Sequence, residues 1–274
     1  MIVAAVPAKS AQYTLKIGSP TINDTYHHWM RLVKAKVEGQ SGGQIAVELY
    51  PASQLGAIPR MVEGVQFGTI EMIQVPAAFL GGVDPRYAVV DSPGLFRDLS
   101  HGYRTGLQPE FAAALRDIGE ARGIRTVGFT CEDWIYYATL KPIRKLDDFN
   151  GKKIRVFGSS IERATLAKLG ATALPMPPDE VIQALQTGAI DGTKAGMTLL
   201  VPFKYFNVTK FALLAEDSMI CGLKLVSKHW FDRLPRELQS VVLEETAKAS
   251  EENLPFILNF VEKVDEHGRP MEAS

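Results

Sequence analysis

The sequence predicts an α/β protein in which two similar lobes enclose a central cleft. With 274 residues, 46% of them hydrophobic, the chain is long enough for two domains of ordinary size. Strand-like and helix-like segments alternate along it. Residues 59–71 are echoed by residues 179–191 as an amphipathic helix, a glycine and an apolar strand. The echo fits an internal repeat or convergence on one common design, and either origin places two α/β units in the chain.

The first elements are predicted as strand, helix, strand, helix and strand. Residues 13–17 alternate and then meet Gly-Ser-Pro, which is typical of a strand that ends in a loop. Asn23 or Asp24 can cap the following helix, which stops at Gly39. The apolar residues of this helix fall on one stripe: Trp29, Leu32, Val33 and Val37. The next strand, short helix and buried strand are predicted at 44–51, 61–68 and 69–75.

Two apolar segments are predicted to connect the lobes as a hinge. Residues 124–140 concentrate β-branched and aromatic residues and are interpreted as a pair of strands crossing into the second lobe. Residues 211–227 are interpreted as the returning pair of strands. The part from residue 234 is predicted as a long helix, which Pro255 can kink. The apolar stripe of this helix is predicted at Leu238, Val241, Val242 and Leu243.

These crossings define the expected domain boundaries. The first lobe is predicted to span residues 12–134 and 223–258, and the second lobe residues 135–222 and 259–274. Residues 1–11 are either the remnant of a secretory signal peptide cleaved after Ala11 or a disordered start.

Composition argues against several classes of function. A net charge of -1 with interspersed signs disfavours a nucleic-acid partner, and the apolar runs are too short to span a bilayer. The sequence contains no familiar metal-ligand or phosphate-loop motif, so neither a metal nor a cofactor is expected. Cys131 and Cys221 are too few for a disulfide framework, and so low a count fits a cytosolic or a periplasmic protein.

Arg155 stands where a predicted strand leads toward a helix. Alternation buries Ile154 and Val156 on one face and directs Arg155 to the other. Ser159 follows in a Gly-Ser-Ser run, whose hydroxyls can cap the helix and whose amides can face an anion. A planar guanidinium can give a carboxylate two parallel hydrogen bonds. Spacing alone also allows a surface arginine at a strand end.

Several motifs together make a family resemblance visible. The motifs are DDFNGKKIRV at 147–156, LGA at 169–171, PMP at 175–177, EVIQALQTGAIDG at 180–192, YPASQLG at 50–56, DSPGLF at 91–96 and WFDRLP at 230–235. In this combination the chain resembles the solute-binding proteins of tripartite ATP-independent periplasmic (TRAP) transporters, of the C4-dicarboxylate-binding type. The resemblance extends over about residues 13–260.

The resemblance implies a fold, a location and a carboxylate-binding residue. It implies a two-lobed periplasmic-binding-protein fold, type II-like, with hinge strands and a long C-terminal helix. Such a monomeric periplasmic receptor closes on an organic acid and delivers it to a TRAP membrane permease. The arginine that pairs with the ligand carboxylate in the family maps onto Arg155. Many members place an asparagine where this chain has Ala195, so this position is apolar, and Lys194 can supply a replacement cation.

Departures from the family pattern shape the expected ligand. Members that bind acidic sugars often carry a second arginine near Ile135, whereas Trp134 and Tyr136 flank that position here and are either ligand contacts or lobe core. We therefore expect a monocarboxylate with an apolar or aromatic body, because buried polar groups need partners. A C4-dicarboxylate or a sugar acid is the alternative. First-lobe contacts are expected from Thr21, Asn23 and Gln74, which can equally be loop or cap residues.

Two other classes of function stay open from the sequence. An enzyme on the same scaffold would use the dense group Cys131, Glu132 and Asp133. A ligand-sensing module of a regulator is the other class, and the lack of a DNA-binding segment in this sequence counts against it.

Overall fold

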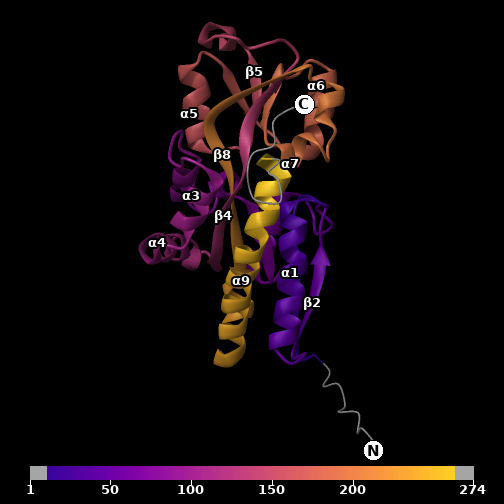
Figure 1. Cartoon of the computed structure of the whole chain (residues 1–274), viewed down its shortest axis with the longest axis vertical. Coiled ribbons are helices and arrows are strands. Elements are labelled where there is room, and N and C mark those ends of the chain that lie inside the picture. Colours follow the sequence, from indigo (N-terminus) through magenta and orange to yellow (C-terminus); the bar gives the residue numbers. More distant parts are fainter. Residues whose placement is uncertain (1–10, 263–274) are drawn as a thin grey trace, which may run out of the picture.

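The computed structural model describes residues 11–262, which form one mixed eight-stranded sheet flanked by helices (Figure 1). The strands are β1 (Tyr13–Gly18), β2 (Ile45–Tyr50), β3 (Met72–Pro76), β4 (Ile124–Thr139), β5 (Lys153–Val156), β6 (Thr172–Pro175), β7 (Gly192–Ala195) and β8 (Phe211–Ser227). The α-helices are α1 (Thr25–Gln40), α2 (Ile58–Phe67), α3 (Leu99–Gly106), α4 (Pro109–Glu120), α5 (Ser160–Lys168), α6 (Val181–Gln186), α7 (Met197–Leu200), α8 (Lys228–Phe231) and α9 (Arg236–Glu262).

The sheet order is β2-β1-β3-β8-β4-β7-β5-β6, which confirms the predicted two-lobed α/β fold. The parallel strands β1, β2 and β3 lie at one end, and β5, β6 and β7 lie at the other. The long antiparallel strands β4 and β8 run side by side through the middle and extend into both lobes (Figure 1). The chain therefore passes between the lobes along two paired strands.

The prediction that each crossing is a pair of strands is wrong, because β4 and β8 are single strands of 16 and 17 residues. Their pairing shifts register at three places, between Thr126 and Gly128, Cys131 and Asp133, and Trp134 and Tyr136. Such bulges bend and twist a strand without ending it. A local pattern interrupted in this way looks like two short strands.

Buried apolar side chains form separate clusters toward the two ends of the sheet. One first-lobe cluster surrounds Trp29 and Val226, and a second surrounds Met61 and Leu225. Other clusters pack around Tyr205 and around Tyr137 in the second lobe. Each lobe therefore has its own core, as two domains joined by a hinge require.

Several local predictions are confirmed. Asp24 caps α1 by accepting a hydrogen bond from the His27 amide, and Gly68 ends α2 with φ 79°, a conformation that glycine adopts easily. Pro255 lies inside α9, which packs along α1 (Figure 1). Val242 is buried, as the predicted apolar stripe of α9 requires. The prediction that Leu243 belongs to this buried stripe is wrong. That side chain lies on the solvent side of the helix and is 39% exposed.

Some predictions concern residues that the structure does not describe. The proposed signal-peptide remnant lies almost wholly before residue 11, and most of segment 259–274 follows residue 262.

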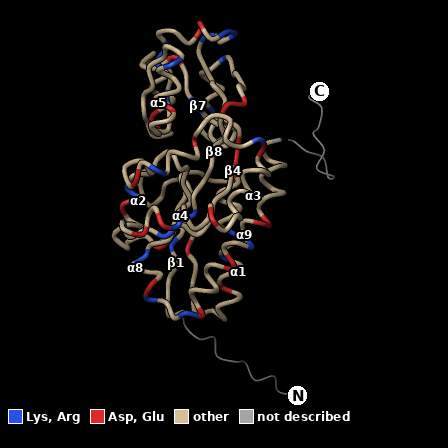
Figure 2. The backbone as a smooth tube through the Cα atoms, turned by 90° about the vertical axis from the view of Figure 1, so that its left-hand side faces the viewer, with Lys and Arg blue, Asp and Glu red and all other residues tan. Residues whose placement is uncertain are grey.

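Within residues 11–262 no helix combines the length and the apolar character needed to cross a membrane. Lys and Arg alternate with Asp and Glu along both lobes (Figure 2).

Candidate functional site

Arg155 lies at the carboxyl end of β5, where it is fully buried. Its Nε donates to the Met176 carbonyl at 2.8 Å, and its Nη1 donates to the Lys194 carbonyl at 3.1 Å. The guanidinium carbon lies 4.4 Å from the centre of the Phe157 ring. Two carbonyls and one aromatic face therefore fix the orientation of the guanidinium, as expected for a ligand-binding group.

Arg155 forms no direct ion pair in the described part of the chain, although Glu162 and Asp179 act on its charge from farther away. No Asp or Glu oxygen of residues 11–262 lies within 4.0 Å of its nitrogens, and Nη2 has no hydrogen-bond partner in the same part of the chain. Burial lowers the pKa of Arg155, but an arginine keeps its proton in proteins. An unpaired buried cation is costly unless an anion joins it. The site is therefore suited to a carboxylate.

A narrow pocket lies between the lobes beside the Phe157 ring. Its first-lobe wall is formed by Pro20, Thr21, Asp24, Tyr26, Ile58, Pro76 and Phe79. Its second-lobe wall is formed by Phe157, Pro178, Thr198, Leu199 and Ile220. Most of this surface is apolar, with a few polar groups at defined places. Its free volume of about 20 Å³ is too small for an organic acid, so the lobes must move apart for one to enter.

The first-lobe residues expected from the sequence occupy different places. Thr21 lines the pocket, and its buried hydroxyl has no partner among the described residues. Asn23 is exposed and lies in the turn before α1 with φ 59°. Gln74 is fully buried and donates to Glu132 at 2.8 Å. The role predicted for these three residues stays a prediction, and the geometry favours Thr21.

The aromatic candidates on β4 pack against the lobes. Trp134 is half-buried against the first-lobe cluster around Met61, and Tyr136 is half-buried against the cluster around Tyr205. Ala195 is fully buried on β7 and pairs with Tyr136 across the sheet. None of these three side chains lines the pocket beside Phe157, and Arg155 does not line it either. Their predicted contact with a ligand is untested, and their surroundings are those of core residues.

Two other candidates lie at the start of α5 and on β7. Ser159 caps α5 by accepting from the Ile161 and Glu162 amides, while Glu162 accepts from the Ser159 amide, as in a capping box. Lys194 is buried, and its Nζ lies 3.2 Å from the Ser218 hydroxyl and 3.9 Å from Glu162 Oε1. Lys194 therefore already has polar neighbours.

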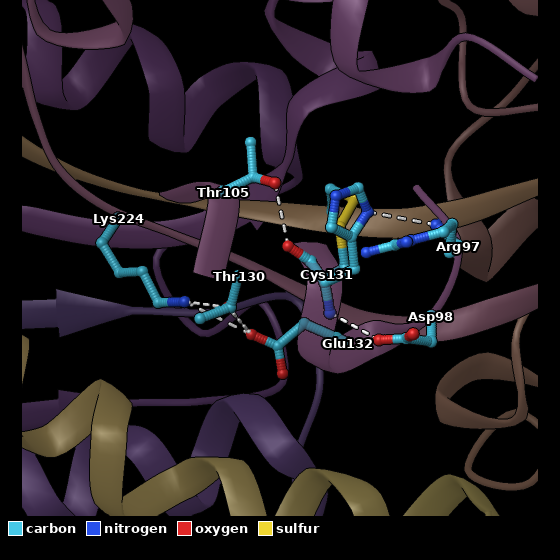
Figure 3. The surroundings of a disulfide bond; sticks show 9 residues. Arg97, Asp98, Thr105, Thr130, Cys131, Glu132 and Lys224 are labelled. Carbon is cyan, nitrogen blue, oxygen red and sulfur yellow. Dashed lines mark hydrogen bonds and ion pairs between the residues drawn. A yellow bond between two sulfur atoms is a disulfide. The ribbon is translucent and has the colours of Figure 1, made fainter. Parts of the chain in front are cut away.

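The three residues considered for catalysis are each engaged in other contacts. Cys131 forms a disulfide bond with Cys221, and Asp133 accepts from the amide and the hydroxyl of Thr198 at 2.8 and 3.0 Å. Glu132 lies 3.3 Å from Lys224 Nζ, and Thr130 contacts both groups (Figure 3). The disulfide leaves Cys131 without a free thiol to act as a nucleophile.

The disulfide and the Glu132–Lys224 pair are features that sequence reasoning missed. Cys131 and Cys221 face each other on β4 and β8, so the bond joins the two strands that connect the lobes. Two cysteines cannot make a framework, but one bond between paired strands needs only their register. The alternation of β4 and β8 was the available signal. Within the described residues no group of three or more His, Cys, Asp or Glu side chains could hold a metal ion.

Comparison with known proteins places the chain in a family. Residues 18–260 match the family model DctP, bacterial extracellular solute-binding protein, family 7. The chain is 28% identical over 241 residues to the 2,3-diketo-L-gulonate-binding periplasmic protein YiaO of Escherichia coli, covering 87% of this chain and 73% of that protein.

Solved structures of TRAP periplasmic solute-binding proteins are also similar. One from Desulfovibrio salexigens, with bound orotic acid, has a TM-score of 0.81 at 27% identity and covers 90% of this chain and 84% of its own. One from Xanthobacter autotrophicus, with bound β-D-galacturonate, has a TM-score of 0.84 at 27% identity and covers 90% and 83%. The expected location outside the cytoplasm is confirmed by the family description. The chain belongs to family 7 of the bacterial extracellular solute-binding proteins and is a solute-binding protein of the TRAP type.

Proposed function

We propose that this receptor binds a monocarboxylate with an apolar or aromatic body and delivers it, as a monomer, to the membrane permease of a TRAP transporter. Arg155 holds the carboxylate, and the pocket beside Phe157 holds the body. The lobes close around the acid as β4 and β8 flex. The observation that carries the proposal is the charge of Arg155, buried without an anionic partner in residues 11–262.

The count of buried cations supports one carboxylate rather than two. Three basic side chains are buried in the part of the chain that the structure describes: Arg155, Lys194 and Lys224. Lys224 lies 3.3 Å from Glu132, and Lys194 lies 3.9 Å from Glu162. A second carboxylate would therefore meet cations that already have acidic neighbours, and like charges nearby disfavour it.

The apolar wall supports a ligand with an apolar or aromatic body. Side chains such as Ile58, Phe79, Phe157 and Leu199 line the pocket. The relative from Desulfovibrio salexigens was solved with orotic acid, which carries one carboxylate on a flat ring. Galacturonate in the second relative keeps a sugar acid as the alternative, which would need more polar partners in the same pocket.

Calorimetry on the Arg155→Ala variant tests the carboxylate site. A thermal-shift screen with orotate, benzoate, phenylacetate, succinate and galacturonate first selects the acid that stabilises the wild-type protein most. We expect Arg155→Ala to weaken binding of that acid at least ~30-fold, since truncating one member of a desolvated charge pair costs on the order of 2–5 kcal/mol.

Two further variants sharpen this test. Arg155→Lys keeps the positive charge but cannot donate two parallel hydrogen bonds to a carboxylate. We therefore expect its affinity to lie between those of the wild type and Arg155→Ala. Arg86→Ala removes an exposed arginine of the first lobe that pairs with Asp84, and should bind as the wild type does. Near-wild-type affinity in Arg155→Ala would exclude the proposed role of this residue.

A further inference from the structure

A second, acidic pocket lies between the lobes next to the first. Its polar lining comes from Asp91, Glu162, Lys194 and Ser218. Asp91 ends the 3-10 helix Pro85–Asp91 of the first lobe, whereas Glu162 belongs to α5 of the second. The rest of the wall is apolar: Pro76, Ala78, Ile135, Phe157, Met219, Ile220 and Cys221. Both lobes therefore contribute an acid to one small pocket.

The unused polar atoms in this pocket are hydrogen-bond acceptors. Glu162 Oε2 accepts from the Gly158 amide at 2.9 Å, but Oε1 is buried and has no hydrogen-bond partner in residues 11–262. Asp91 Oδ2 is equally buried and has no hydrogen-bond partner in that range, although the Ser159 hydroxyl is close enough to act on this carboxyl group. Lys194 Nζ lies 3.2 Å from the Ser218 hydroxyl and 3.9 Å from Glu162 Oε1. The pocket therefore offers Glu162 Oε1 as an acceptor to a group that enters it.

The acidic pocket adjoins the place where Arg155 would hold a carboxylate. The two pockets share Pro76, Phe157 and Ile220 as wall residues. The Arg155 guanidinium packs on the Phe157 ring, and the Lys194 carbonyl accepts from Arg155 Nη1. Arg155 itself lines neither pocket, so an acid anchored on it reaches Asp91 and Glu162 only if the lobes move apart and widen the space beside Phe157.

We propose that Asp91 and Glu162 form a subsite that selects acids whose body carries an O–H or N–H donor. This inference rests on the proposed carboxylate site at Arg155 and specifies the substrate class of that site. A hydroxyl entering the pocket can donate to Glu162 Oε1 and bond to Asp91, whereas an N–H group can donate to Glu162 Oε1. An acid without a donor leaves Glu162 Oε1 with only the Lys194 ammonium, 3.9 Å away.

The charges around the pocket favour a neutral donor over an ammonium group. Burial, with the nearby Glu162 carboxylate, raises the pKa of Asp91 to about 8. Asp91 is then largely protonated at pH 7, so its carboxyl group can donate as well as accept. The Glu162 carboxylate and the Lys194 ammonium leave little net charge beside it. A hydroxyl or a ring N–H fits this balance better than a second cation beside Lys194.

The experiment measures preference between acids that differ by one donor. Titration calorimetry on the full chain at pH 7 would use benzoate with 3- and 4-hydroxybenzoate, butanoate with 3- and 4-hydroxybutanoate, and 4-aminobutanoate for the ammonium group. We expect the wild type to bind at least one hydroxy acid ~10-fold more tightly than its parent acid. Asp91→Asn and Glu162→Gln should each reduce that preference at least ~5-fold.

Controls separate this subsite from the carboxylate site and from a simple contact between the lobes. Glu245→Gln makes the same change at a buried acid of α9 far from the cleft, and should keep the preference. Equal weakening of parent and hydroxy acids by both Asp91→Asn and Glu162→Gln would overturn the subsite in favour of a latch between the lobes. The subsite would also be overturned if the wild type bound hydroxy acids no more tightly than their parent acids. If Arg155→Ala abolishes binding of all the acids while both pocket variants keep the preference, the subsite fails and the carboxylate site stands.

Discussion

The disulfide between β4 and β8 should contribute much of the stability of the second lobe. Cys131 and Cys221 lie at the places where the chain enters and leaves this lobe, so the bond closes most of the lobe into a ring. With a sequence separation of 90 residues, the chain-entropy relation gives about 4–5 kcal/mol at 25 °C. We therefore expect the variant with Cys131→Ala and Cys221→Ala to lose about that much free energy of unfolding.

Urea unfolding followed by circular dichroism at pH 7 measures this loss. Each single variant breaks the same bond, so either one should lose nearly as much as the double variant, and the two effects should not add. Both sulfurs are buried, so mild reductant should leave the folded wild type unchanged and act only once urea opens the lobe. An unchanged unfolding free energy in the double variant, or additive single effects, would refute the reasoning.

Three further predictions concern the hinge and the cleft. A Cβ at Gly102 would lie 2.5 Å from the disulfide sulfur of Cys131. Gly102→Ala should therefore lower the unfolding free energy by about 1–3 kcal/mol. An unchanged unfolding free energy in urea would contradict this packing. Lys224→Met leaves the buried Glu132 carboxylate without its cation and should lower the unfolding free energy by about 3–5 kcal/mol. Adding Glu132→Gln should restore much of that loss. Unfolding midpoints of the wild type, both single variants and the double variant test the pairing. Folded Asp91, with its pKa raised to about 8, keeps a proton that the unfolded chain releases near pH 4. The stability contributed by the Asp91 proton is full below about pH 4 and falls as the pH rises to about 8. The melting temperature should therefore fall less between pH 5 and pH 9 in Asp91→Asn than in the wild type. An equal fall in both proteins would oppose a proton on Asp91.

The sequence was most informative where short-range patterns decide the structure. The Ser159 helix cap and the Gly68 helix end depend on residues within one or two turns, and both are as predicted, whereas the reciprocal bond from Glu162 was not predicted. Arg155 lies at a strand end as expected, and its role as carboxylate anchor stays a prediction. Alternation and capping rules suffice for such positions because each involves only local backbone geometry.

Sequence reasoning missed contacts whose partners come from distant parts of the chain. The predicted ligand contact of Gln74 stays a prediction, but the hydrogen bond from its amide to Glu132, 58 residues away, was not foreseen. Nothing near Gln74 in the sequence indicates that acid, and only the pairing of β3, β8 and β4 brings them together. The disulfide depends on the register of β4 and β8 in the same way, and the acidic subsite depends on the approach of the two lobes. Tertiary contacts of this kind leave no local pattern to recognise.

The unpaired atoms on both sides of the cleft also explain how binding can drive closure. Three first-lobe atoms are buried without hydrogen-bond partners among the described residues: Thr21 Oγ1, Asp24 Oδ2 and Tyr26 Oη. On the second-lobe side, Arg155 Nη2 is also buried and has no hydrogen-bond partner among them. Each such atom costs about 1–3 kcal/mol when the lobes close over it without a partner. An acid whose carboxylate meets Arg155 and whose body reaches the first-lobe groups removes that cost only in the closed state. Because a ligand shifts a conformational equilibrium by its difference in affinity for the two states, these atoms couple recognition to closure.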